Sequence, residues 1–183
     1  MSFAVRPIGL VKSAFVFRQT ISSDATNYVL RNAAITAGWD GIVPLDAEVT
    51  VASGIVLSAN STSLYGFETG SGFPAGTTLK LIMPGYVCGM GGAGGAVYTA
   101  GSNGGPALRA QYAISIDAAG GVIGGGGGGG GSDEYGGGGG GRSGRTDAAG
   151  ASGGASGTFS SGGSGGGGGG GAGGTTGPGG AGS

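Results

Sequence analysis

Glycine is the residue that most constrains this chain, because its second half has too few apolar side chains to bury a conventional core. Of the 53 glycines among 183 residues, nine lie in residues 1–85 and the other 44 in the last 98. Unbroken runs occupy residues 124–131, 136–141 and 165–171. They show no strict Gly-X-Y period and contain little proline, which excludes collagen. The second half is therefore either a flexible linker or an ordered packing of extended glycine segments.

These two alternatives differ in how the backbone N–H and C=O groups find partners. A glycine-rich linker is a random coil, and ordering it costs roughly 1–2 kcal/mol per residue. Polyglycine in the polyproline-II form has about three residues per turn and no internal hydrogen bonds, so neighbouring helices pair laterally. Each lateral bond contributes only about 0.5–1.5 kcal/mol, so many must form together.

Short non-glycine segments between the glycine runs favour the ordered alternative, because a linker has no need for clustered interruptions. These segments are residues 98–100, 132–135, 142–149 and 158–160. We therefore expect a polyglycine-II helix bundle over residues 124–183, with the interrupting side chains placed on its turns.

The first half has the pattern of an ordinary folded protein. Residues 1–46 are expected to form an N-terminal segment with one short helix over roughly residues 25–37. Asp24 is the expected N-cap of this helix, and Gly38 is the expected left-handed residue at its C-terminal end. Trp39 is expected to pack back on the helix, and a turn at Asp40 leads to strand-like patterning.

Residues 47–123 repeat a unit made of a short strand, a glycine-containing turn and a second short strand. The three units cover residues 49–57, 79–87 and 114–123, and Val51, Leu81 and Ile116 are separated by 30 and 35 residues. Recurrence at this spacing predicts stacked strand layers, as in a small solenoid or a β-sandwich. The predicted fold is mostly β, a solenoid-like domain with one N-terminal helix, followed by the polyglycine-II bundle.

Composition excludes several classes of function. Charged residues make up 9% of the chain and the net charge is -1, so no basic stripe is available to bind nucleic acid. The chain has no histidine and a single cysteine, Cys88, which we expect to be a small buried hydrophobe. No enzymatic activity, metal site or cofactor is therefore expected. Apolar stretches in residues 1–18 are too short for a signal peptide or a membrane span, so synthesis in a cytoplasm without membrane insertion is expected.

Three stretches resemble glycine-rich tail-tip and tail-fibre proteins of bacteriophages. They are residues 36–41 (TAGWDG), 69–79 (TGSGFPAGTTL) and 105–110 (GPALRA). The back half is similar to the distal receptor-recognition adhesins of long tail fibres. This resemblance implies a β-rich attachment domain carrying a sandwich of polyglycine-II helices, whose tip loops bind an outer-membrane protein or a surface polysaccharide. It also implies a non-enzymatic virion protein that docks to other tail proteins through residues 1–46, with a homotrimer possible.

Side chains that interrupt the glycine runs are the candidates for receptor contact, since aromatic residues supply rigid contact area at low entropic cost. Tyr98 and Tyr112 are instead expected to pack where strands meet glycine. The candidates, which also include charged residues suited to loop pairing or to an anionic glycan, are Asp133, Glu134, Tyr135, Arg142, Arg145 and Phe159.

Two other functions fit the same composition. One is a purely structural tail-tip or fibre assembly protein without direct receptor contact. The other is ice binding, because polyglycine-II bundles also occur in antifreeze proteins, although those resembling this chain are secreted and carry disulfides. The single cysteine and the lack of a signal peptide favour the virion functions over ice binding.

Overall fold

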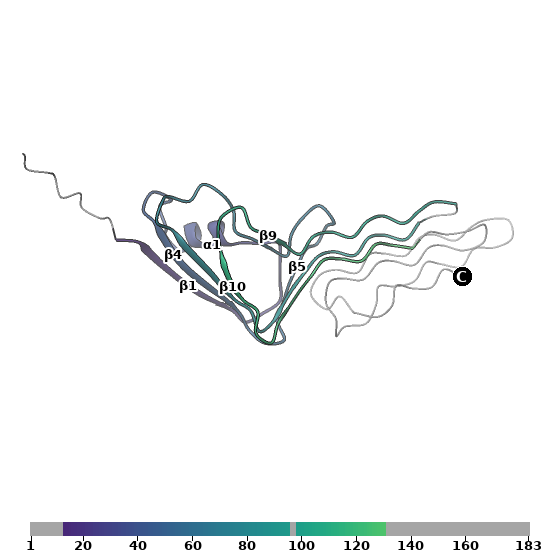
Figure 1. Cartoon of the computed structure of the whole chain (residues 1–183), viewed down its shortest axis with the longest axis horizontal. Helices are drawn as coiled ribbons and strands as arrows, with labels where there is room; N and C mark the ends of the chain where they lie inside the picture. Colours follow the sequence, from purple (N-terminus) through teal and green to yellow (C-terminus); the bar gives the residue numbers. More distant parts are fainter. Residues whose placement is uncertain (1–12, 96–97, 131–183) are drawn as a thin grey trace, which may run out of the picture.

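Parallel strands stacked in successive coils form the body of the protein, and a narrow arm projects from one side of it (Figure 1). The structure is a computed structural model and describes residues 13–95 and 98–130. Within these residues each coil contributes one strand to a first sheet and, after a sharp turn, one strand to a second sheet. The first three coils then add a strand to a third sheet, so the body is three-sided.

Every strand pair is parallel, and within each sheet the strands follow one another in chain order. This arrangement confirms the predicted solenoid-like stack of layers. The first sheet comprises β1 (Phe15–Ile21), β4 (Leu45–Val51), β7 (Thr78–Ile82) and β10 (Ser115–Asp117). The second comprises β2 (Ala25–Thr26), β5 (Val56–Ser58), β8 (Tyr86–Cys88) and β11 (Val122–Gly124). The third comprises β3 (Tyr28–Val29), β6 (Phe67–Glu68) and β9 (Leu108–Arg109).

The stack begins earlier in the chain than the sequence units indicated. All seven residues of β1 pair with β4, and β2 pairs with β5. Residues from the segment expected to serve for attachment therefore form the first coil of the body. Their role in attachment is a separate matter and stays a prediction.

One helix, α1 (Leu30–Thr36), is present in the described part of the chain, and it is shorter than expected. Asp24 is not its N-cap: the cap is Val29, without a side-chain hydrogen bond, and Asp24 Oδ1 instead accepts a bond of 2.8 Å from Val56 N–H in the next coil. The residues before Leu30 were predicted to be helical, but they pair as strands with β5 and β6. Here strand pairing in the tertiary structure overrides local helix propensity.

The C-terminal end of α1 confirms the expected stop. Gly38 adopts a φ of 103°, and its N–H donates to the carbonyl of Ile35 over 2.9 Å. Trp39 N–H donates to the carbonyl of Ala34 over 3.0 Å, which completes a Schellman motif. Trp39 is 2% exposed and packs back on the helix as predicted, and Asp40 Oδ1 accepts from Ile42 N–H in the following turn.

Register within the sheets differs from the predicted alignment at one position. Leu81 pairs with Ile116 as expected, but its partner in β4 is Val49, 32 residues earlier, and not Val51. The second sheet keeps the offset of 30 residues, since Val56 pairs with Tyr86. The predicted offset of 30 residues therefore holds between β5 and β8 but not between β4 and β7, because Val49 stands seven residues before Val56 whereas Leu81 stands five residues before Tyr86.

The core lies between the three sheets and is built from the inward-facing side of each strand. In β4 every second residue from Leu45 to Val51 is buried, which is the alternation expected of a strand with one face on a core. In the second coil Phe67 is fully buried and stacks on Tyr28 at a ring separation of 5.6 Å. Burial raises the pKa of the Tyr28 phenol, whose O–H donates to Gln19 Oε1 over 2.6 Å.

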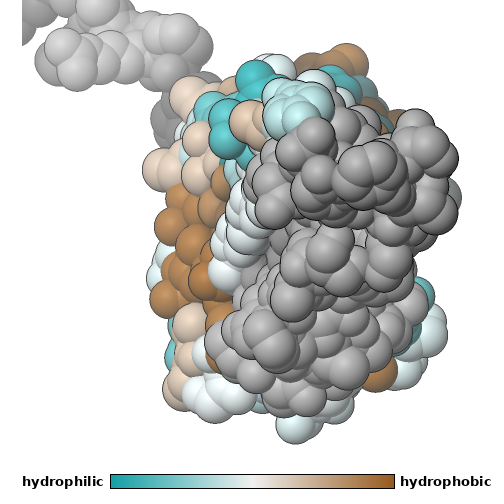
Figure 2. Space-filling view, turned by 90° about the vertical axis from the view of Figure 1, so that its right-hand side faces the viewer, coloured by the Kyte–Doolittle hydropathy of each residue, from teal (hydrophilic) through white to brown (hydrophobic). Residues whose placement is uncertain are grey.

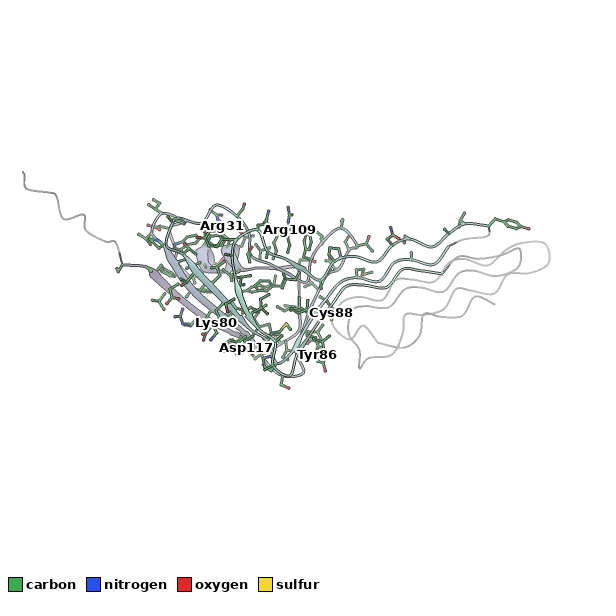
Figure 3. The ribbon with its side chains drawn as sticks, in the orientation of Figure 1. Arg31, Lys80, Tyr86, Cys88, Arg109 and Asp117 are labelled. Carbon is green, nitrogen blue, oxygen red and sulfur yellow. The ribbon has the colours of Figure 1, made fainter. Side chains whose placement is uncertain are left out.

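Ion pairs between neighbouring coils line the outer side of the first sheet, where Figure 3 shows Lys80. Arg18 contacts Asp46 at 2.6 Å, and Lys80 contacts Glu48 at 3.2 Å. The hydrogen bond from Arg18, followed by one from Thr78, holds the pKa of Asp46 below its usual value. These partly exposed pairs align the coils more than they stabilise them, since exposed ion pairs contribute little.

Leu81 and Ile116 offer a matched test of the stack, because they are neighbours in one inward-facing row but differ in burial. Leu81 is 0% exposed, whereas Ile116, in the last coil, is 39% exposed. We expect Leu81→Ala to lower the free energy of unfolding by about 2–5 kcal/mol and Ile116→Ala to lower it by about 1 kcal/mol. Urea denaturation measures both, and equal losses would contradict the coil order described here.

Candidate functional site: the glycine arm

Among the described residues, three extended segments project from the body (Figure 1), and we call these residues, 89–95, 98–105 and 124–130, the glycine arm. The first segment leaves the body directly from β8, and the third leaves it from β11. Cys88 pairs with Gly124, and Gly89 N–H then donates to the carbonyl of Gly124 over 2.8 Å. The pairing of two adjacent strands thus continues without a break from the body into the arm.

Hydrogen bonds in the arm recur at every third residue, whereas those of a strand ladder recur at every second. The first segment donates to the third, the third donates to the second, and the second donates to the first. Each of the three segments therefore bonds to both others, which closes a triangular bundle. The bonds are Gly89 to Gly124, Gly92 to Gly127, Gly95 to Gly130, Gly126 to Gly105, Gly129 to Ser102, Ser102 to Ala93 and Gly105 to Met90, all between 2.7 and 2.9 Å.

Close packing in the arm requires glycine at specific positions, and these positions also recur every third residue. A Cβ atom placed on any of them would lie closer than 3.0 Å to a backbone carbonyl of a neighbouring segment. By contrast, a Cβ on Gly128 would meet its nearest neighbour, the carbonyl oxygen of Ser102, at an ordinary 3.7 Å. The constrained positions are Gly89, Gly92, Gly95, Gly101, Gly104, Gly126 and Gly129.

Residues other than glycine occur in the arm only between the constrained glycine positions. Ser102 uses its side chain as an additional lock: its Oγ accepts from Ala93 N–H over 2.8 Å and donates to the Ala93 carbonyl over 3.3 Å. The arm thus accommodates side chains such as those of Ala93 and Ser102 between the constrained positions, where its segments meet through their backbones.

Tyr98 lies where the arm turns back towards the body, between its first and second segments. Its φ is 55°, and its side chain is 71% exposed, the largest exposed fraction among the large hydrophobic residues that the structure describes. The expectation that Tyr98 packs at a junction of strand and glycine is therefore wrong. Tyr112 does pack on the core, with its ring 5.0 Å from that of Phe73.

A sequence signal for Tyr98 was present. It stands in a short interruption between two glycine-rich segments, which is the same context that singled out Tyr135. The candidates predicted from the sequence all lie outside the described residues, so their placement stays a prediction: Asp133, Glu134, Tyr135, Arg142, Arg145 and Phe159.

Besides the ion pairs of the first sheet, the body carries a polar cluster on the outer side of the third sheet, where Figure 3 shows Arg109. Arg109 lies 3.7 Å from Glu68 and stacks over the ring of Tyr65 at 5.3 Å. These groups are each other's partners, which is typical of a surface network. Cys88 is buried at the root of the arm, as expected of a small hydrophobe (Figure 3).

Two searches of the described residues concern metals and membranes. Among residues 13–95 and 98–130, no three or more acidic or cysteine side chains are grouped so as to hold a metal ion. No helix in that part of the chain is long and apolar enough to cross a bilayer.

On the side from which the arm projects, Figure 2 shows apolar surface beside polar surface.

The fold and the arm together define a class of protein, a parallel-strand body that presents a glycine-rich projection. Comparison with known families identifies it further: residues 16–183 match the family described as phage tail fibre adhesin Gp38, and the chain belongs to this family. Searches of curated proteins and of solved structures found no match. Membership assigns the protein to the bacteriophage tail fibre, and therefore to the virion, with an adhesive role.

Gly128 and Gly129 give a direct test of the packing in the arm, because they are adjacent but face different surroundings. We expect Gly129→Ala to break the pairing with the first segment, since its Cβ would overlap the carbonyl of Ala93. Gly128→Ala should be tolerated, because its Cβ has room. Limited proteolysis of the arm measures both effects. Equal resistance of the two variants would show that the segments do not approach one another as described.

Proposed function

We propose that this protein is a non-enzymatic receptor-recognition adhesin at the tip of a bacteriophage tail fibre, in which a rigid polyglycine-II arm presents short loops to the host surface. The observation that carries this proposal is the three-residue period of the lateral hydrogen bonds in the arm. That period is typical of polyproline-II helices, which have three residues per turn. The runs at 136–141 and 165–171 extend the bundle in this proposal.

Rigidity is what the polyglycine arm contributes to binding. A flexible loop loses conformational freedom when it binds a receptor, whereas a loop fixed in advance loses little. Seven lateral backbone bonds and the Ser102 side chain hold the described segments together. The receptor-contact surface therefore comprises the turns of the arm, with Tyr98 added to the candidates from residues 131–183.

Receptor contact by Tyr98 has support from its position and its exposure. An aromatic side chain has few rotatable bonds, buries a large area on binding, and is enriched among residues that dominate interface energies. Exposing such a ring at 71% has no benefit for folding. The partner in this proposal is a host outer-membrane protein or a surface glycan, both of which bind aromatic rings.

Attachment to the fibre is assigned to residues 1–46. In the described part of this segment, residues 13–46, three large hydrophobic residues are exposed: Val16 at 62%, Ile35 at 42% and Ile42 at 68%. Phe15 N–H donates to the carbonyl of Pro44, so the loop that carries Ile42 lies beside the start of β1. In Figure 1 this start lies at the end of the body farthest from the arm, which suits a molecule held at one end and binding at the other.

Truncating Tyr98 tests the adhesive role. We expect Tyr98→Ala to weaken binding of the purified protein to host cells by about 2 kcal/mol, roughly thirty-fold in Kd. The unchanged protein should delay adsorption of the phage that carries it, by competing for receptor, and the variant should delay it much less. Tyr98→Phe, which keeps the ring, is the matched control and should compete almost as well as the unchanged protein.

The same variant separates the adhesin from a purely structural protein of the tail tip. If the role is adhesive, particles with Tyr98→Ala assemble with a normal content of this protein and adsorb slowly. Failure of these particles to assemble would favour the structural role. Normal adsorption would remove Tyr98 from the contact surface and leave the candidates in residues 131–183.

Docking through the first segment is tested at Ile42. Burying an isoleucine contributes roughly 1.5–3 kcal/mol, so Ile42→Ser should weaken attachment to the fibre by about ten- to a hundred-fold and lower the content of this protein in purified particles. Leu64→Ser is the control, because Leu64 is also partly exposed, at 42%, but lies outside residues 1–46. Equal loss with both variants would argue against a docking surface in the first segment. In a separate measurement, the native mass of the purified protein shows whether it is a monomer or a homotrimer.

A further inference from the structure

The second segment of the arm contains a chemically reactive pair, Asn103 followed by Gly104. It is the only asparagine–glycine pair in the chain. Asparagine is prone to cyclise when glycine follows it, because the next backbone nitrogen carries no neighbouring Cβ that would hinder its approach. We propose that Asn103 is a site of spontaneous deamidation, and that the isoaspartate formed there disrupts the register of the glycine arm. This inference concerns the chemistry of the arm and does not depend on the proposed receptor.

The reaction needs only water. The backbone nitrogen of Gly104 attacks Cγ of Asn103, the Cγ–Nδ2 bond breaks, and ammonia leaves with the proton of the Gly104 N–H. Water then opens the succinimide ring. Attack at the side-chain carbonyl gives aspartate, and attack at the main-chain carbonyl gives isoaspartate, in which the chain continues through Cβ and Cγ.

Asn103 differs from the other asparagines in its surroundings. Its side chain is exposed, and among the described residues it has no hydrogen-bond partner. Asn27 is held by a bond of 3.2 Å from Asn60 N–H to its Oδ1 and precedes a tyrosine, and Asn32 lies within helix α1. Asn60 precedes a serine. These three residues serve as controls within the same chain.

Isoaspartate would matter at this position because the arm depends on a strict spacing. Ser102 N–H donates to the Ala93 carbonyl, and Gly105 N–H, three residues later, donates to the Met90 carbonyl. The carbonyls of Ser102 and Gly105 accept from Gly129 and Gly126 at the same spacing. Isoaspartate adds one methylene to the main chain between these anchors, so both pairs of bonds cannot stay in register. Aspartate adds a charge but leaves the spacing unchanged.

The experiment incubates the full-length protein in mildly alkaline buffer, which favours attack by the backbone nitrogen, and follows it by tryptic peptide mapping. Asn103 lies in the peptide 81–109, whereas Asn27 lies in 19–31 and both Asn32 and Asn60 lie in 32–80. We expect isoaspartate to accumulate in peptide 81–109, and we expect Asn27, Asn32 and Asn60 to remain unchanged. If Asn103 stays intact over a time in which it converts in the urea-unfolded chain, the folded arm protects it and the proposal is wrong.

Hydrogen exchange tests the structural consequence. In the isoaspartate form, amides of residues 98–109 should exchange about fivefold faster or more, which corresponds to the loss of at least one hydrogen bond. Asn103→Asp has the same charge without the extra methylene and should exchange like the unchanged protein. Asn103→Gln, which cyclises much more slowly, should keep slow exchange after incubation. Equal exchange in the isoaspartate and Asn103→Asp forms would overturn the claim that register is lost.

Discussion

Hydrogen bonding between backbone groups of neighbouring extended segments is the interaction on which the rest of this structure depends. In the body it sets the coils at a fixed spacing, so that inward-facing residues such as Val49, Leu81 and Ile116 form a continuous row. In the arm the same kind of bond holds three segments together without a core of side chains. The hydrophobic effect dominates the body, but only there, since the arm has almost no apolar surface to remove from water.

Body and arm share one register and differ in the period of their bonds. The pair formed by β8 and β11 continues into the first and third arm segments, where bonds recur every three residues and no longer every two. The change occurs where the sequence turns to glycine, at Gly89 and Gly124. Without a Cβ, the segments approach closely enough for backbone to replace side chains as packing material. The stack of coils therefore fixes where the arm begins and which of its segments are neighbours.

Much of the body could be predicted from the sequence, because its signals are local or repeated. The strand–turn–strand units, the stop at Gly38 and the packing of Trp39 are examples. The residues before Leu30 were misassigned because their strand pairing involves partners more than thirty residues away. The shift of Val49 against Val51 came from a difference in turn length, which periodicity alone does not reveal.

For the candidate site, the sequence indicates the kind of position but not every residue. Clustered interruptions of glycine identified the turns as candidate contacts, and Tyr98 satisfied that criterion but was assigned to packing. The error has a physical source: a tyrosine that follows a valine suits a buried site equally well, and only the reversal of the chain places it at the surface. Positions where glycine is obligatory were also hidden, since they follow from contacts between segments and not from any one segment.

The continuous path from β8 and β11 into the arm has a mechanical consequence. If the arm binds the host at its tip, as proposed, tension from a tethered particle runs along residues 89–95 and 124–130 into two paired strands of the second sheet. These segments are parallel, so the load acts as shear along their shared hydrogen bonds and is divided among them. Peeling, in which bonds break one at a time, would require a force directed across the arm.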